Sequence, residues 1–311
     1  MKKGTTMRIG LTGATGFLGR YLVANLATAG HRLRCWHRPT SQHEGLEPFQ
    51  GSLTWVPGEL GDDHASDALV EGCDAVVHSA LYHPSGGFMG GEGDLLPFLE
   101  TNLMGTIRLI EAARAAGVKR FVFISTCAVY DTILGDRPLD ETHPLWPASH
   151  YGAHKAALEA FVHSYGQGHG YPICALRPTG IYGLAHPPQK SKWFDLVSTV
   201  ARGEPVECRR GGKEVHAADV ARAVAILLAA EVEAITGQSF NCCDRYVSEH
   251  EVATIARERS GANGEILGTP SAPKNQIVTT KLQALGMQFG GRPLLERTIA
   301  EMLGATSSTQ S

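Results

Sequence analysis

Residues 8–19 read RIGLTGATGFLG, and this stretch decides the fold of the chain. An apolar segment is followed by Gly13, Gly16 and Gly19 in the spacing GxxGxxG, and residues 16–29 then continue with helical spacing. A glycine-rich turn between a buried strand and a helix lets a pyrophosphate approach the backbone and the free N–H groups of the helix start. The stretch therefore predicts a dinucleotide loop, with a ligand-free tight turn as the alternative. Its predicted contact residues are Gly13, Thr15, Gly16, Phe17, Leu18 and Gly19.

The end of the second predicted strand bears on the choice of dinucleotide. Residues 34–39 read RCWHRP, without the carboxylate that would hold the ribose hydroxyls of NAD. Arg38 stands where a 2′-phosphate needs a cation. The pattern favours NADP over NAD as the cofactor, and a solvated surface arginine is the alternative interpretation of Arg38.

Apolar strand-like runs alternate with helical patterns through the first 180 residues. The runs are residues 8–12, 33–36, 53–56, 75–78, 121–125 and 173–176, with helical patterns at residues 16–29, 64–71, 94–116 and 150–165. Such alternation forms right-handed βαβ units and a parallel sheet, and near-continuous apolar strands fit burial on both faces. The predicted fold class is α/β: a Rossmann-type doubly wound parallel sheet with helices on both faces, plus a smaller C-terminal α/β substrate-binding region.

The length of 311 residues is typical of about two domains. We expect a dinucleotide-binding Rossmann domain at residues 7–180, with residues 217–242 returning to it. Residues 181–216 and 243–304 are expected to form the smaller substrate-binding domain. Residues 305–311 are small and polar, and are expected to be a frayed tail.

The composition excludes several classes of protein. Lys plus Arg is 28 and Asp plus Glu is 31, so the net charge of −3 provides no basic surface for nucleic acid. No apolar run is long enough to cross a membrane, and the N-terminal residues do not resemble a signal peptide. Seven scattered cysteines without metal-ligand spacing argue against disulfides and against a metal site. We therefore expect a cytoplasmic protein without membrane or nucleic-acid partners.

A tyrosine and a lysine form the candidate catalytic pair. Tyr151 and Lys155 are four residues apart in a predicted helix and so lie on one face of it. A neighbouring cation favours phenolate and is expected to lower the tyrosine pKa. Ser125 and Thr126 follow the fifth predicted strand, at the carboxyl edge of the sheet where ligands bind. A hydroxyl there can hydrogen-bond the substrate oxygen that the tyrosine protonates.

Three motifs together resemble the extended short-chain dehydrogenase/reductase family, the NAD(P)-dependent epimerase/dehydratase group. They are GATGFLG at residues 13–19, ISTCAVY at residues 124–130 and YGAHK at residues 151–155. The resemblance covers residues 7–303 and implies hydride transfer between a nicotinamide and a carbinol carbon. It implies that Tyr151 is the general acid/base and that Lys155 tunes Tyr151 and holds the nicotinamide ribose. Thr126, which lies 25 residues before Tyr151, would bind the reacting oxygen.

Further blocks of the chain match the same family. They are DAVVHSA at residues 74–80, NLMGT at residues 102–106, RPTGIYG at residues 177–183 and the segment around Asp219. In the turn at residues 58–60, Glu59 stands where the family usually has an aspartate for the adenine. The further cofactor residues that the resemblance implies are Glu59, Leu60, Ser79, Ala80, Leu81, Asn102, Pro178 and Ile181.

The sequence gives weaker evidence for the substrate-binding residues than for the cofactor residues. Nucleotide-sugar epimerases usually have an arginine for the diphosphate at the position of Gly212. Arg209, Arg210 or Lys213 would have to reach the diphosphate instead, and a solvated basic turn is the alternative interpretation. A second glycine cluster, residues 85–93, is expected to be a loop over the site, with Tyr82, His83 and Phe88 as substrate candidates. Trp193 is either a substrate wall or part of the core of the smaller domain.

These observations support one leading function and two alternatives. The first is an NAD(P)-dependent oxidoreductase or epimerase that resembles nucleotide-sugar epimerases and dehydratases. The second is an NADPH-dependent ketone or aldehyde reductase similar to dihydroflavonol reductases, which Arg38 and the missing diphosphate arginine favour. The third is an inactive cofactor-sensing regulator, against which the intact Thr126, Tyr151 and Lys155 argue. The family commonly pairs its helices into dimers, so the resemblance also implies a homodimer.

Overall fold

The computed structural model describes residues 6–84, 90–270 and 273–307. Its internal contacts divide the chain into two compact units. Unit 1 contains residues up to Pro178, Val220–Cys242 and Ile277–Met287, and unit 2 contains Thr179–Asp219, Cys243–Gln276 and the residues from Gln288 onward. Each unit is described by itself below.

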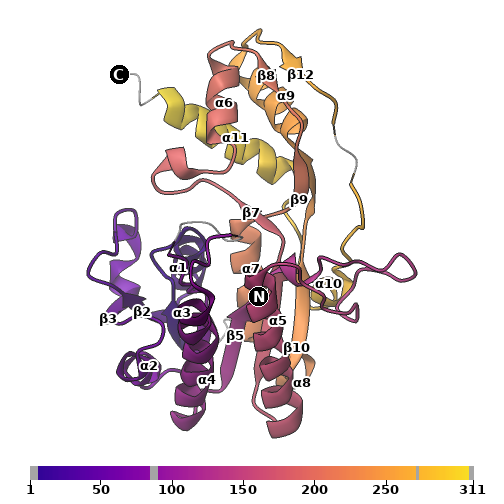
Figure 1. Ribbon diagram of the computed structural model, residues 1–311. Helices are drawn as coiled ribbons and strands as arrows, with labels where there is room; N and C mark the ends of the chain where they lie inside the picture. The colour runs from indigo at the N-terminus through magenta and orange to yellow at the C-terminus, as the bar shows by residue number, and fades with distance from the viewer. Residues whose placement is uncertain (1–5, 85–89, 271–272, 308–311) are drawn as a thin grey trace. The chain divides into compact units, whose positions relative to one another are not determined.

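Unit 1 is built on a sheet of seven parallel strands in the order β10-β6-β5-β4-β1-β2-β3 (Figure 1). The inner strands are almost wholly apolar and buried, because helices cover both faces of a parallel sheet. This confirms the predicted doubly wound α/β fold. The strands are β1 (Arg8–Thr12), β2 (Arg32–His37), β3 (Leu53–Pro57), β4 (Ala75–His78), β5 (Arg120–Ile124), β6 (Ile173–Pro178) and β10 (Gln238–Cys242).

The helices of unit 1 connect the strands by crossovers. Helix α1 (Phe17–Thr28) leads from β1 toward one edge of the sheet, whereas α4 (Gly105–Ala115) leads from β4 toward the other. Right-handed crossovers in opposite directions place helices on opposite faces and leave a crevice between β1 and β4. Helices α2 (Asp63–Val70), α4 and α5 (His150–His163) lie side by side on one face (Figure 1). The remaining helices are α3 (Leu95–Leu99), α7 (Ala217–Ala229), α8 (Val232–Ile235) and α10 (Thr280–Ala284).

The core under α2, α4 and α5 is large and aromatic. Phe121 and Phe123 of β5 are fully buried against Leu109 of α4 and Leu158 of α5. Each such side chain stabilises the fold by roughly 1.5–3 kcal/mol relative to its exposed form. Trp36 also enters this core, and its indole N–H donates to Ala65 O at 2.9 Å, so its polar atom is satisfied.

Unit 2 has its own small sheets and core. Strands β7 (Gly180–Tyr182), β9 (Gly211–His216) and β11 (Arg245–Ser248) form one sheet, and β8 (Val206–Glu207) pairs with β12 (Ile266–Leu267). Helices α6 (Phe194–Ala201), α9 (Glu249–Ser260) and α11 (Gly291–Ser307) bury the apolar residues between them. Helix α11 includes residues 305–307, which the sequence pattern had placed in a frayed tail.

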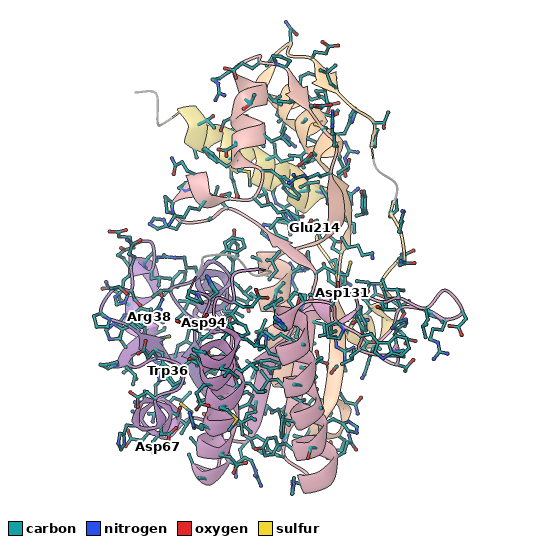
Figure 2. The ribbon with its side chains drawn as sticks, in the orientation of Figure 1. Trp36, Arg38, Asp67, Asp94, Asp131 and Glu214 are labelled. Atoms are coloured by element: carbon teal, nitrogen blue, oxygen red, sulfur yellow. The ribbon has the colours of Figure 1, made fainter. Side chains whose placement is uncertain are left out.

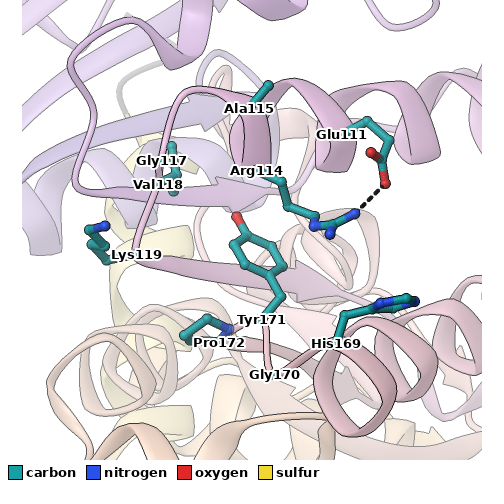
Figure 3. A pocket seen from close by; sticks show the side chains of 10 residues that line it. All are labelled: Glu111, Arg114, Ala115, Gly117, Val118, Lys119, His169, Gly170, Tyr171 and Pro172. Carbon is teal, nitrogen blue, oxygen red and sulfur yellow. Dashed lines mark hydrogen bonds and ion pairs between the residues drawn. The ribbon is translucent and has the colours of Figure 1, made fainter.

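One surface cleft of unit 1 lies away from the residues that the sequence motifs mark. A cleft of about 510 Å³ lies at the end of α4 and the start of β6, where Arg114 pairs with Glu111 at 2.9 Å (Figure 3). This is the amino edge of the sheet, opposite the edge at which ligands of such folds bind. Along the described ranges, no helix combines the length and the apolar character needed to cross a membrane.

Two glycines in the segment that extends α5, Ser164–Gly168, make a matched pair for a stability test. A Cβ on Gly166 would lie 2.2 Å from the Cα of Gly237, whereas a Cβ on Gly168 meets nothing within 4 Å. We expect Gly166→Ala to lower the free energy of unfolding by about 1–3 kcal/mol through overpacking. Gly168→Ala should leave it unchanged or raise it by up to about 1 kcal/mol. Chemical denaturation checks this, and equal stability of the two variants would contradict the packing described.

Candidate active site

The loop between β1 and α1 has the geometry that an anion requires. Gly13 has φ +75°, and a Cβ on Gly19 would lie 1.9 Å from Gly13 O, so both positions need glycine. Gly16 caps α1 without a side-chain hydrogen bond, which leaves N–H groups of the first turn available. The residues of this loop fit a pyrophosphate at the helix start. Thr15 and Phe17 are half-buried at the loop, and Leu18 is buried beneath it.

A buried chain of hydrogen bonds fixes this loop to β4. Thr12 Oγ1 accepts from the N–H groups of Ser79 at 3.1 Å and Ala80 at 3.0 Å, so its own proton goes to His78 Nδ1 at 2.7 Å. His78 Nε2 must then carry the ring proton and donate to Thr106 Oγ1 at 2.8 Å. Burial lowers the pKa of His78 to about 3, so the ring is neutral, as this arrangement requires. This chain of hydrogen bonds holds Ser79 and Ala80 beside Gly13. A Cβ placed on Gly13 would lie 3.0 Å from Ala80 N.

Asn102 lies in a π-helical segment, Glu100–Met104, between α3 and α4. Its side-chain oxygen accepts from Tyr82 N at 2.8 Å, and its amide donates to Tyr82 O at 2.9 Å. Both groups of the carboxamide therefore act on the backbone just after β4, beside the half-buried Leu81. Irregular helical turns of this kind are frequent at functional sites.

The residues expected at the adenosine end lie beyond β2 and β3. Arg38 follows β2 and its side chain is exposed, while its backbone N–H donates to Ser41 Oγ at 2.9 Å (Figure 2). Glu59 is exposed and Leu60 is half-buried after β3. Arg38 is thus accessible to a phosphate, and Glu59 to a polar ligand group.

Thr126 and Tyr151 are joined by a hydrogen bond between their side chains. Thr126 follows β5, and its Oγ1 also accepts from Ala128 N at 3.1 Å. Tyr151 lies in the first turn of α5, where Glu92 Oε1 accepts from its backbone N–H at 3.0 Å. The structure therefore brings the two predicted hydroxyl groups together at the carboxyl edge of the sheet.

Lys155 is buried one turn further along α5. Its Nζ donates to Ile124 O at 2.8 Å and lies 4.5 Å from the centre of the Phe123 ring. Burial lowers the pKa of Lys155 to about 7, and the carboxylate of Glu159 opposes this shift. The ammonium is therefore in balance with the neutral amine near neutral pH.

The expected lowering of the Tyr151 pKa is wrong for this structure. Burial raises the pKa of Tyr151, and the hydrogen bond from Thr126 opposes the rise only in part. The lysine ammonium is directed at the carbonyl of Ile124. Desolvation of the phenolate thus outweighs the effect of the neighbouring cation.

Sequence reasoning missed several buried polar residues around this pair. His154 is 2% exposed, with its ring 4.9 Å from Phe98 and 5.5 Å from Tyr151 between ring centres. Burial lowers the pKa of His154 to about 3, so it is neutral. Glu159 was missed as well. Its burial has no signal in the sequence except the four-residue step from Lys155 to Glu159 on the helix face.

The remaining predicted cofactor residues, Pro178 and Ile181, and the predicted substrate residues belong to both units. In unit 1, Pro178 ends β6 and is buried, and Tyr82 and His83 are exposed after β4; Phe88 lies outside the described residues. In unit 2, Ile181 lies in β7, and Arg210 is exposed on the turn before β9. Arg209 is on the same turn and pairs with Glu207, with Nε 2.6 Å from Oε1.

Trp193 has a constrained position within unit 2. It precedes α6 with φ 70°, an uncommon value for a large side chain, and its ring centre lies 5.3 Å from that of Tyr182. Lys192 Nζ lies 5.1 Å from the Trp193 ring centre and 2.5 Å from Glu214 Oε1. Burial raises the pKa of Glu214, and Lys192 opposes the rise. Trp193 therefore packs with Tyr182 and the Lys192–Glu214 pair.

The structure combines a glycine loop that fits a dinucleotide, a parallel sheet and the Thr126–Tyr151–Lys155 arrangement. Together these features define a class of nucleotide-dependent enzyme folds. Comparison with known proteins specifies the family. Residues 9–243 match the model of the NAD dependent epimerase/dehydratase family. The chain belongs to this family, as its motifs indicated.

Known relatives match this chain over part of its length. The dTDP-D-glucose 4,6-dehydratase of Mus musculus is 30% identical over 192 residues, which are 59% of this chain and 53% of that protein. The UDP-glucose 4-epimerase of Rhizobium leguminosarum bv. trifolii is 33% identical over 159 residues, 50% of this chain and 46% of that protein. A 3 beta-hydroxysteroid dehydrogenase/Delta 5→4-isomerase of Mycobacterium tuberculosis is 32% identical over 199 residues, 61% of this chain and 51% of that protein. The chain spans about half the length of these relatives.

Solved structures share the whole fold. A UDP-glucose 4-epimerase from Thermotoga maritima, solved with UDP-glucose, superposes with a TM-score of 0.79 at 21% identity, covering 98% of this chain and all of that one. A UDP-glucose 4-epimerase from Thermus thermophilus, solved with NAD, gives a TM-score of 0.75 at 24% identity over 96% of this chain and all of that one. At these identities the likeness establishes the fold alone.

Proposed function

We propose that the protein is an NAD(P)-dependent oxidoreductase or epimerase that acts on a secondary alcohol or carbonyl carbon and resembles nucleotide-sugar epimerases and dehydratases. The observation that carries the proposal is the hydrogen-bonded Thr126–Tyr151 pair with Lys155 buried beside it in the same helix. The glycine loop between β1 and α1 and the segment Ser79–Ala80 would hold the dinucleotide. A bound nicotinamide supplies the hydride acceptor or donor.

The three side chains have distinct parts in this reaction. Tyr151 Oη takes the proton of the substrate hydroxyl when the alcohol is oxidised and returns it when the carbonyl is reduced. Thr126 Oγ1 hydrogen-bonds the same substrate oxygen and orients it toward Tyr151. Lys155 binds ribose hydroxyls through its ammonium, in place of the carbonyl of Ile124.

Tyr151→Phe tests the proposed proton transfer. We expect turnover to fall by at least about 10²–10⁴-fold, because the proton loses its carrier. Dinucleotide affinity should be unchanged, because the loop at Gly13 is untouched. Steady-state kinetics with nucleotide sugars and small ketones, and calorimetric titration with NAD and NADP, measure the two quantities.

Variants of the threonine provide the matched control for this test. Thr126→Ser keeps the hydroxyl and should retain activity, whereas Thr126→Val is isosteric without it and should lose most of the activity. Full turnover by Tyr151→Phe would refute the proposed mechanism.

The reductase alternative rests on two observations. Gly212 stands at the diphosphate position of the nucleotide-sugar enzymes, and the nearby Arg209 is engaged by Glu207. The relative from Mycobacterium tuberculosis is named as a dehydrogenase of a steroid, which carries no nucleotide. A tightly retained NAD in the purified protein would support the epimerase, and exchangeable NADPH the reductase. The more distant alternative, an inactive sensor, requires that no substrate turn over.

We propose NADP as the preferred dinucleotide, on the exposed Arg38 after β2. Arg38→Ala should weaken NADP binding by about 10–100-fold, the value of a lost charge-assisted hydrogen bond, and leave NAD binding unchanged. The exposed Arg137→Ala is the control and should affect neither. Calorimetric titration measures both ligands, and equal loss of NAD and NADP affinity in Arg38→Ala would contradict a 2′-phosphate contact.

We propose a homodimer formed by the helices on the α4–α5 face. Leu96 of α3 is 78% exposed, Met104 39% and Phe161 of α5 41%, so neighbouring helices present apolar side chains to solvent. Light scattering after size exclusion should give twice the chain mass, and Leu96→Lys with Phe161→Lys should give the monomer. Leu267→Lys, at an exposed apolar residue of unit 2, is the control and should remain dimeric. A wild-type monomer would refute the proposal.

We also propose a cytoplasmic location. The support is that the seven cysteines, all of which lie in the described ranges, form no disulfide, and six of them are buried.

A further inference from the structure

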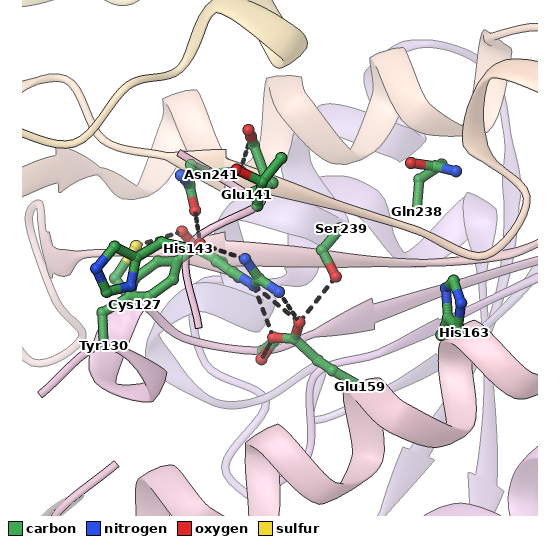
Figure 4. A network of polar contacts seen from close by, with 12 residues as sticks. Cys127, Tyr130, Glu141, His143, Glu159, His163, Gln238, Ser239 and Asn241 are labelled. Carbon is green, nitrogen blue, oxygen red and sulfur yellow. Dashed lines mark hydrogen bonds and ion pairs between the residues drawn. The ribbon is translucent and has the colours of Figure 1, made fainter. Parts of the chain in front are cut away.

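A carboxylate is buried beneath the proposed catalytic residues. Glu159 lies on α5, four residues after Lys155, and is 4% exposed. Its oxygens accept hydrogen bonds from the hydroxyl groups of Ser125 and of Ser239, the latter at 2.8 Å (Figure 4). Arg177 of β6 donates to both oxygens, with Nε at 3.0 Å from Oε1 and 2.8 Å from Oε2. The carboxylate is therefore held at once from β6, from β10 and from the residue that follows β5.

The other side of Arg177 is equally constrained. Its Nη1 donates to the hydroxyl of Tyr130, which also lies 3.0 Å from Asn241 Oδ1. The backbone N–H of Asn241 donates to Glu141 Oε1 at 2.7 Å (Figure 4). The guanidinium has no freedom to leave Glu159, so the position of the carboxylate is rigid.

The stability of the fold is by itself a weak explanation for the buried ion pair between Glu159 and Arg177. Taking both ions out of water costs about as much as their attraction returns, and well-packed apolar residues often serve equally well. A negative charge at this place in the fold has a clearer consequence for the lysine one turn earlier, because residues four apart on a helix are neighbours.

The charged groups around Lys155 come from several elements. Burial lowers the pKa of Lys155 to about 7, and Glu159 is the carboxylate that opposes this. His78 and His154 are neutral, because burial lowers the pKa of each to about 3. The phenol of Tyr151 is neutral as well, because burial raises its pKa. The titratable groups that face Lys155 or its carboxylate are Tyr151, His154 and Glu159 of α5, His78 of β4, Tyr130 after β5, and Arg177 of β6.

We propose that Glu159 is a positioning residue of this site: its rigidly held carboxylate keeps Lys155 charged, so that the ammonium can bind the dinucleotide at neutral pH. The inference rests on the proposed function, because it assigns Lys155 to the ribose. Ser125, whose hydroxyl donates to Glu159, directly precedes Thr126, so the same carboxylate also anchors the segment that carries the substrate-binding hydroxyl.

The pH dependence of dinucleotide binding tests the proposal. Binding needs the ammonium, so wild-type affinity should fall as the pH rises through about 7. In Glu159→Gln the lysine loses its carboxylate, and the midpoint of this fall should move down by about one pH unit or more. Calorimetric titration with NAD and with NADP measures the midpoint. The titrations run from about pH 5.5 to about pH 9, which is roughly two pH units on either side of neutrality.

Two further variants make the result specific. Glu159→Gln alone leaves the Arg177 cation buried without a carboxylate to balance its charge. The double variant Glu159→Gln/Arg177→Met removes both charges and decides the matter if the single variant does not fold. Removal of the Arg177 cation by itself would raise the pKa of Lys155. A lowered midpoint in the double variant therefore results from the loss of the Glu159 carboxylate. Glu141→Gln removes a carboxylate from the far end of the same network and should leave the midpoint unchanged.

Each outcome has a definite meaning. A lowered midpoint in the Glu159 variants together with an unchanged one in Glu141→Gln supports the proposal. An unchanged midpoint in folded Glu159 variants overturns it and leaves the proposed function standing. A wild-type protein that binds neither dinucleotide at any pH overturns the proposed function and this inference with it.

Discussion

The buried ion pair between Glu159 and Arg177 fixes where α5 lies on the sheet, and the proposed chemistry depends on that placement. Arg177 belongs to β6 and Ser239 to β10, while Ser125 directly follows β5, so the carboxylate joins a helix to two strands and to the end of a third. An apolar contact specifies the position of α5 through shape alone, whereas charge-assisted hydrogen bonds also require a particular direction. A carboxylate with donors on both oxygens permits one position, and Tyr151 and Lys155 lie on that same helix.

The cofactor loop is fixed in a comparable way from the other side of the crevice. Thr12 uses all its hydrogen-bonding capacity on His78, Ser79 and Ala80, and this requires one tautomer of a neutral histidine. The glycines then let α1 approach β1 closely, since a Cβ on Gly19 would overlap the carbonyl of Gly13. Polar groups thus set the positions of the glycine loop and of α5, and the apolar core supplies most of the stability.

Periodicity predicted most of unit 1 because its strands are buried on both faces and its helices are amphipathic. The run at residues 173–176 was recognised, although β6 continues to Pro178. The π-helical segment around Asn102 was not, because its hydrogen bonds with Tyr82 depend on a distant loop. Glu159 was also missed, since a charged helical residue has the sequence pattern of a solvent-facing one until Arg177 is placed beside it. Residues 277–287 join unit 1 through contacts such as Lys281 Nζ to Ser239 O, which no local pattern encodes.

The electrostatics of the site differ from what the motif alone implies. A Tyr-Lys pair on a helix face favours phenolate with ammonium when both are solvated, yet here burial raises the tyrosine pKa and lowers that of the lysine. Both shifts favour the neutral phenol and the neutral amine. Either side chain is therefore charged only where a neighbouring group stabilises its ionised form. Thr126 does so for the phenolate through a hydrogen bond, and Glu159 does so for the ammonium through its charge. The residues around the pair, more than the pair itself, therefore determine at which pH the proposed proton transfer can occur.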